Sequence, residues 1–246
     1  MFSVEQRDAV RDRVIALAKQ DPRIIAGAVV GSLALGGGDE FSDLDLTFAV
    51  IDDVPIVTVL DDWTGKLRDE FGAVELVDLA LGPTTYRVLL LADALQVDLS
   101  MTPANRFVPG GPRFRLLFGK TVGTGPTPVA PDAADLFGWG VIYALHSRTC
   151  IERGRLWQAE HYIGAVRDHA LSLACLRHGL IAVQARGYDD LPADVLARLA
   201  HTHIGSLEPD VLRAALAAAT RSLLAEGKEA NVPSAKTSAK RLAALI

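Results

Sequence analysis

The sequence contains few cysteines and no long apolar run. Only Cys150 and Cys175 occur among its 246 residues, and both fall in helical patterns. We therefore expect reduced core thiols in a cytoplasmic protein rather than a disulfide framework. No apolar run approaches the ~20 residues that span a bilayer, which argues against a membrane protein. The first twenty residues are charged and amphipathic, unlike a signal peptide.

The sequence also lacks an excess of positive charge. It carries 25 basic and 30 acidic residues, and residues 1–131 hold 12 basic and 18 acidic ones. A nucleic-acid-binding protein usually presents a broad basic surface, so this balance argues against a nucleic-acid partner. Half of the residues are apolar, which excludes a disordered chain and provides material for a core.

The first part of the chain alternates between strand and helix patterns. Apolar periodicity predicts the following elements: a helix over 3–20, strands over 24–30 and 43–51, a helix ending at 71, and strands over 74–81, 86–91 and 95–101. A helix over 84–95 remains an alternative, because that run is too apolar for periodicity to decide.

The second part has a different pattern. Glycine and proline crowd residues 102–131, which predicts a connection between domains. Four helices are then expected, over 135–153, 156–178, 192–201 and 209–225, and the polar tail 226–246 is expected to fray. The sequence thus predicts an α+β protein, with a mixed-sheet domain at 1–118 and a helical bundle at 132–246.

Two carboxylates lie close together at the start of the second predicted strand. On an extended strand, Asp43 and Asp45 point to one face while Leu44 and Leu46 point to the other. Like charges at this spacing repel unless a cation lies between them. Oxygen ligands favour a hard divalent ion, Mg²⁺ first.

The turn before these carboxylates suits a phosphate. Gly31-Ser32 ends the first strand and precedes a short helical segment. A helix start offers free backbone N–H groups, glycine allows close approach, and the hydroxyl of Ser32 can donate to a phosphate oxygen. Together the two features predict a site for a nucleoside triphosphate and its metal.

The motif Gly31-Ser32-x-Ala34-x-Gly36, followed by Ser42-Asp43-x-Asp45-Leu46, resembles the signature of the nucleotidyltransferase superfamily of DNA polymerase β type. Within it, the chain is most similar to the small-molecule, or antibiotic, nucleotidyltransferases. The resemblance implies a catalytic N-terminal domain and a helical substrate-binding domain. It also implies a third carboxylate on a later strand, for which Asp98 is the first candidate and Glu75 and Asp78 are rivals. Leu35 departs from the pattern, since many relatives carry a basic residue there.

The resemblance also implies a role for each candidate residue. Asp43, Asp45 and Asp98 would bind Mg²⁺ and act in catalysis. Gly31 and Ser32 would bind the β- and γ-phosphates of ATP or another NTP. On the helix over 156–178, Glu160 and Arg167 share one face, which makes Glu160 a candidate base and Arg167 a candidate phosphate ligand. Lys120 is a second basic candidate for the phosphates.

The expected reaction is transfer of AMP, or another NMP, to a hydroxyl of a small molecule such as an aminoglycoside- or lincosamide-like antibiotic, with release of pyrophosphate. One alternative is a toxin-type nucleotidyltransferase that modifies RNA or protein. Another is a sensor that binds ATP and Mg²⁺ without transfer. The sequence does not decide which acceptor is used or whether the protein forms a homodimer.

Overall fold

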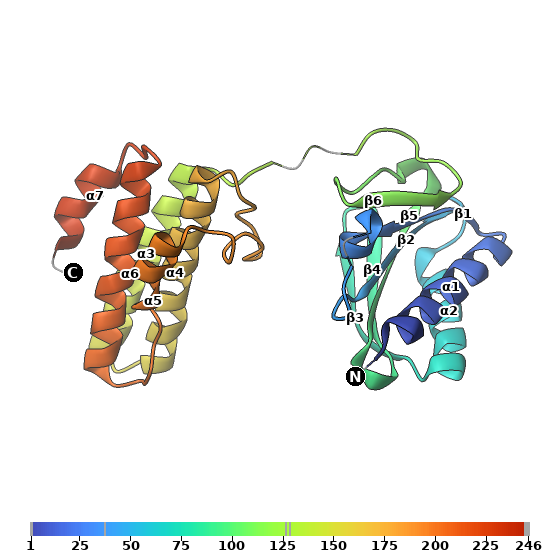
Figure 1. Cartoon of the computed structure of the whole chain (residues 1–246), viewed down its shortest axis with the longest axis horizontal. Coiled ribbons are helices and arrows are strands. Elements are labelled where there is room, and N and C mark those ends of the chain that lie inside the picture. Colours follow the sequence, from blue (N-terminus) through green and yellow to red (C-terminus); the bar gives the residue numbers. More distant parts are fainter. Residues whose placement is uncertain (1, 37, 126, 128, 244–246) are drawn as a thin grey trace. The chain divides into compact units, whose positions relative to one another are not determined.

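The computed structural model describes residues 2–36, 38–125, 127 and 129–243. The chain divides into two compact units, Met1–Pro128 and Val129–Ile246 (Figure 1). The first unit combines a sheet with helices, and the second consists of helices joined by loops. The predicted α+β class, with a mixed sheet followed by a helical bundle, is therefore confirmed.

Within the described residues, the sheet of the first unit has six strands in the order β3-β4-β5-β2-β1-β6. Only β2 and β5 pair in parallel, and every other neighbouring pair is antiparallel. The strands are β1 (Ile24–Val30), β2 (Leu44–Val50), β3 (Val74–Leu81), β4 (Thr84–Leu90), β5 (Gln96–Pro103) and β6 (Phe114–Phe118). The central position of β2 and β5 places their side chains in the middle of the sheet.

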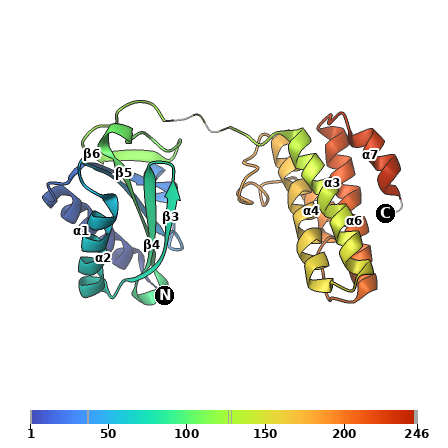
Figure 2. The same cartoon turned by 180° about the vertical axis from the view of Figure 1, so that it is seen from behind.

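Helices α1 (Val4–Gln20) and α2 (Ile56–Phe71) cover one face of this sheet (Figures 1 and 2). Side chains alternate along β2, so Leu44, Leu46 and Phe48 lie buried beneath the helices. The ring of Phe48 meets that of Trp63 from α2 edge-on, with 5.0 Å between ring centroids. Asp45 and the residues that alternate with it lie on the opposite face of β2.

A buried carboxylate joins the end of α1 to α2. Asp21 accepts hydrogen bonds from Arg23 Nε at 2.8 Å, from Arg23 Nη2 at 2.7 Å and from Trp63 Nε1 at 3.0 Å. The Arg23 guanidinium holds the pKa of this carboxyl well below its usual range, against the opposing effect of burial. The contact ties the turn between α1 and β1 to α2.

Two sequence predictions for the first unit are corrected. The alternative helix over 84–95 is wrong: β4 ends at Leu90, and a short 3-10 turn, η2 (Ala92–Ala94), leads into β5. The segment 102–131 is more than a connection, because it contains η3 (Ala104–Arg106) and β6. β6 pairs with β1, which lies far away in the sequence, so local composition gave no sign of it.

The second unit contains five helices within its described residues: α3 (Ala133–Glu152), α4 (Leu156–Arg177), α5 (Ala193–Ala200), α6 (Pro209–Glu229) and α7 (Ala235–Leu242). Helices α3, α4 and α6 run side by side in both views and share one hydrophobic core (Figure 2). Cys150 and Cys175 are buried free thiols. Across the described chain, no helix combines the length and apolar character that a membrane crossing requires.

The expected fraying of the tail is wrong up to residue 243, and residues 244–246 lie outside the described part. Helix α6 continues to Glu229, and α7 follows it. Glu226 is 1% exposed and accepts from Arg177 Nη2 at 3.0 Å and Arg198 Nη2 at 2.8 Å. This buried ion cluster fixes the last turns of α6 against α4 and α5.

Candidate active site

Three carboxylates converge on the sheet face opposite α1 and α2. Asp45 on β2 and Asp98 on β5 are directly paired across the parallel strands, and Asp43 immediately precedes β2. One carboxylate oxygen from each of the three lies within 4.8 Å of the others, and all three side chains are half-buried. We call Asp43, Asp45 and Asp98 the triad, and the sheet face that carries it the triad face.

The triad is electrostatically crowded. Burial raises the pKa of Asp98, and the negative charge of Asp43 raises it further. A hydrogen bond of 2.9 Å from Gln96 Nε2 to Asp98 Oδ1 acts in the opposite direction. Because carboxylates this close repel one another, a cation placed among the three is favourable.

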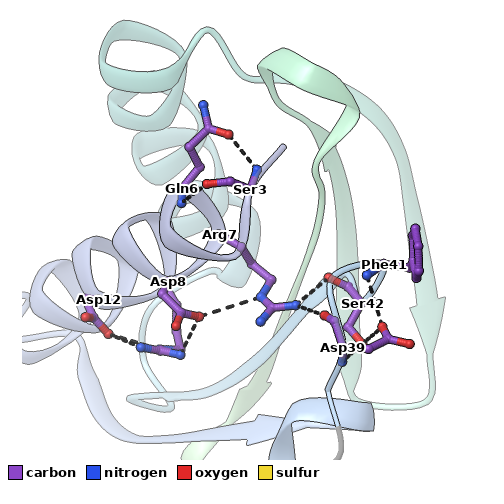
Figure 3. A network of polar contacts seen from close by, with 9 residues as sticks. Ser3, Gln6, Arg7, Asp8, Asp12, Asp39, Phe41 and Ser42 are labelled. Atoms are coloured by element: carbon purple, nitrogen blue, oxygen red, sulfur yellow. Dashed lines mark hydrogen bonds and ion pairs between the residues drawn. The ribbon is translucent and has the colours of Figure 1, made fainter. Parts of the chain in front are cut away.

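The loop before Asp43 is held by a buried arginine. Figure 3 shows Arg7 extending from α1 to this loop, where its Nη1 donates to the backbone carbonyls of Asp39 and Ser42. Within the loop, Asp39 Oδ1 accepts from Phe41 N at 3.0 Å and from the Ser42 hydroxyl at 2.9 Å. The network therefore fixes the backbone on which Asp43 is carried.

Sequence reasoning missed Arg7, although the signal was present. Arg7 lies at helical spacing with Val10, Val14 and Leu17, the apolar residues that α1 buries. A cation on the buried stripe of a helix needs acceptors inside the fold. Its position therefore predicts a partner in the loop or strand that the helix covers.

Gly31 brings the turn after β1 against the triad. The turn is a short 3-10 helix, η1 (Gly31–Leu35), and Gly31 adopts a left-handed φ of 69°. A Cβ built on Gly31 would collide with Oδ2 of Asp45. Glycine is therefore required for two reasons, its backbone conformation and the space that the carboxylate fills. Ser32 follows in the same turn and is half-buried.

Lys120, predicted to contact phosphate, lies away from this turn. It follows β6 next to Gly119, whose backbone packs against Ile25 at the start of β1. Gly31 lies six residues beyond Ile25, which corresponds to ~20 Å along an extended strand. The basic residue that does contact η1 is Arg115, whose Nε donates to Ala34 O at 3.1 Å. The proposed role of Lys120 at the phosphates stays a prediction.

The two rival acids have a different role. Asp78 accepts from Arg87 Nε at 2.7 Å and from Arg87 Nη2 at 2.6 Å, and Glu75 lies 3.4 Å from the same guanidinium. Arg87 also donates to Asp61 of α2 at 2.7 Å, which places the whole cluster on the helix-covered face. Asp98 therefore lies beside Asp43 and Asp45, whereas Glu75 and Asp78 do not.

The remaining predicted residues, Glu160 and Arg167, lie in the second unit. Both are on α4 and partly buried. Arg167 Nε lies 3.4 Å from Asp168, and both line a cavity of about 640 Å³ with Tyr188 on its wall. The proposed roles of Glu160 and Arg167 in the reaction stay predictions.

The triad fits a divalent cation. It offers carboxylate oxygens only, from three side chains that are close enough to share one ion, and it lies partly open to solvent. Hard cations such as Mg²⁺ and Mn²⁺ prefer this donor set, whereas zinc is more often held by nitrogen and sulfur. The space that Gly31 leaves allows Asp45 to occupy the site without a clash.

Solved structures that resemble the chain include the following two. One is an aminoglycoside 6-adenyltransferase from Bacillus subtilis, with 12% identity and a TM-score of 0.43, covering 100% of this chain and 99% of that chain. The other is a nucleotidyltransferase-like protein from Exiguobacterium sibiricum, with 15% identity and a TM-score of 0.36, covering 91% and 77%. The structural neighbours are nucleotidyltransferases by name.

The sequence itself matches no family model and no curated protein. At these identities and TM-scores the likeness does not extend to substrate, metal or acceptor. We therefore infer the function from the residues of the site.

Proposed function

We propose that this protein is a metal-dependent nucleotidyltransferase that moves AMP from ATP, or another NMP from its NTP, to a hydroxyl of a small molecule. The observation that supports the proposal most is the convergence of the triad beside Gly31. The acceptor class that we propose is a hydroxylated antibiotic of aminoglycoside or lincosamide type.

In the proposed reaction, the acceptor oxygen bonds to the α-phosphorus while the bond from that phosphorus to the β-phosphate oxygen breaks. Pyrophosphate leaves with the bonding electrons. Bound Mg²⁺ would stabilise the charge on the attacking and leaving oxygens. Asp43 and Asp45 would hold the ion that binds the triphosphate, and Gly31 and Ser32 would bind its terminal phosphates. Asp98 would hold a second ion and help accept the hydroxyl proton, with Glu160 as the other candidate base.

The test uses ATP labelled at either the α- or the γ-phosphate, with Mg²⁺ and a panel of aminoglycosides and lincosamides. We expect label from the α-position on the acceptor, and label from the γ-position only in pyrophosphate. Asp45→Asn should lower transfer about 100-fold or more, because the positioning of charge dominates such reactions. Asp53→Asn, in the exposed loop after β2, is the matched control and should leave transfer unchanged.

Other outcomes would refute the proposal. Strong labelling of RNA or protein in a cell lysate, without any labelled small molecule, would favour the toxin-type alternative. Tight ATP binding without transfer to any acceptor would favour a sensor. Unchanged activity of Asp45→Asn would show that the metal assignment is wrong.

A further inference from the structure

On β3 and β4, the triad face carries apolar side chains, whereas a sheet face exposed to solvent usually carries polar ones. Within these two strands, which are described throughout, the charged residues are Glu75, Asp78 and Arg87, and they pair with one another on the opposite face. The triad face instead carries Val77, Leu79, Tyr86, Val88 and Leu90. An antiparallel sheet with one solvent-exposed face normally carries its polar side chains on that face.

These side chains are accessible. Val77 is 44% exposed, Leu79 48% and Leu90 38%, and Tyr86 and Val88 are half-buried. We call these five residues the apolar floor. A contiguous exposed apolar surface of this kind usually marks a binding site.

The apolar floor is continuous with the triad. Asp45 pairs with Asp98, Asp98 pairs with Val88, and Val88 pairs with Val77. Directly paired residues share a face and lie about 5 Å apart. A row of side chains therefore leads straight from the carboxylates onto the apolar floor.

The apolar floor and η1 lie on opposite sides of the triad. The triad is on β2 and β5, and the sheet continues through β4 and β3 on one side and through β1 and β6 on the other. η1 follows β1 and contacts β1, β2 and β6. In phosphoryl transfer, the attacking and leaving oxygens are roughly in line with the phosphorus between them. If pyrophosphate leaves towards η1, the acceptor approaches over β4 and β3.

A second copy of the chain bound permanently to the apolar floor does not fit this place. Val88 is one strand spacing from Asp98, so a subunit that covered the apolar floor would bury the carboxylates as well. A ligand that binds and leaves with each turnover would cover the apolar surface and still leave the triad accessible between turnovers. The acceptor is such a ligand.

We infer that the apolar floor binds the acceptor, and that the acceptor is a hydroxylated molecule with an alkyl or other apolar face rather than a polycation. This inference rests on the proposed function and narrows its acceptor class. Polycationic sugars are recognised through carboxylates, whereas β3 and β4 keep their acids on the other face, paired with Arg87. The Tyr86 hydroxyl adds a polar group that suits a ring hydroxyl.

The test compares lincomycin, which carries an alkyl chain and one basic nitrogen, with kanamycin, a polycation, in transfer from α-labelled ATP. We expect labelled lincomycin and little labelled kanamycin. In the double variant Val77→Lys and Leu79→Lys, the KM for lincomycin should rise about tenfold or more, while kcat and the affinity for ATP stay near the wild-type values. Lysine is well tolerated on an edge strand such as β3, so the fold should persist.

The control is Val57→Lys on α2, which is 51% exposed and lies outside the triad face. It should leave the KM for lincomycin unchanged. Preferential labelling of kanamycin, or an unchanged KM in the double variant, would overturn the inference and leave the nucleotidyltransferase intact. If neither compound is labelled although ATP and Mn²⁺ bind, the acceptor class is wrong. If ATP and Mn²⁺ do not bind either, the proposed function itself fails.

Discussion

Arg7→Met should destabilise the first unit and weaken metal binding, because Arg7 holds the loop that carries Asp43. Arg7 is 3% exposed, and its guanidinium donates two hydrogen bonds to backbone carbonyls. Hydrogen bonds to charged groups contribute roughly 1.5–3 kcal/mol each. Methionine keeps the bulk of the chain and removes the cost of burying a charge, which offsets part of the loss. We therefore expect a decrease of about 3 kcal/mol in the free energy of unfolding.

The assay is guanidinium-chloride unfolding followed by circular dichroism, together with Mn²⁺ titration of the folded variant. Residues that position metal ligands typically change affinity 10- to 100-fold, so a tenfold weaker Kd for Mn²⁺ is expected. The matched control is Arg11→Met on the same helix, which removes partly exposed ion pairs to Asp8 and Asp12. Such pairs contribute about 0–1 kcal/mol. An Arg7→Met variant as stable as the Arg11→Met variant, with unchanged Mn²⁺ affinity, would refute the reasoning.

Three further predictions concern glycine, pH and the second unit. Gly31→Ala should weaken Mn²⁺ binding at least tenfold, whereas Gly36→Ala should not, because both have left-handed φ but only the Cβ at Gly31 meets Asp45. Asp21→Asn should be less stable than wild type at pH 7, and the difference should shrink below about pH 4. The folded-state pKa of Asp21 is lowered, so its contribution is complete above the unfolded pKa and lost as pH falls. Glu226→Ala should lower the stability of the second unit by about 3 kcal/mol in thermal unfolding, because it leaves two arginines without their shared carboxylate.

The motif and the central strands could be read from the sequence. Alternation around Asp43 and Asp45 placed the carboxylates on one face, and the buried runs predicted β1 and β2 to within a residue or so. The third acid could not be fixed by pattern alone, since Asp78 and Asp98 are both isolated acids on apolar strands. The structure distinguishes them by Arg87, which neutralises Asp78 on the other face.

Features that depend on distant contacts escaped the sequence. β6 is a strand because β1 supplies its hydrogen bonds, although its own neighbourhood is rich in glycine and proline. The end of α6 is ordered by arginines from α4 and α5, so a tail that looks polar is folded. The pairing of β6 with β1 also places Lys120 beside the start of β1, a position that local sequence did not indicate.

The central claim is that Asp43, Asp45 and Asp98 together bind divalent metal beside the turn that begins at Gly31. Electron paramagnetic resonance of free Mn²⁺, titrated with protein and a non-hydrolysable ATP analogue, measures this directly. We expect binding to the wild type, at least tenfold weaker binding in Asp45→Asn and in Asp98→Asn, and wild-type affinity in Asp53→Asn. Equal Mn²⁺ affinity in all four proteins would contradict the claim.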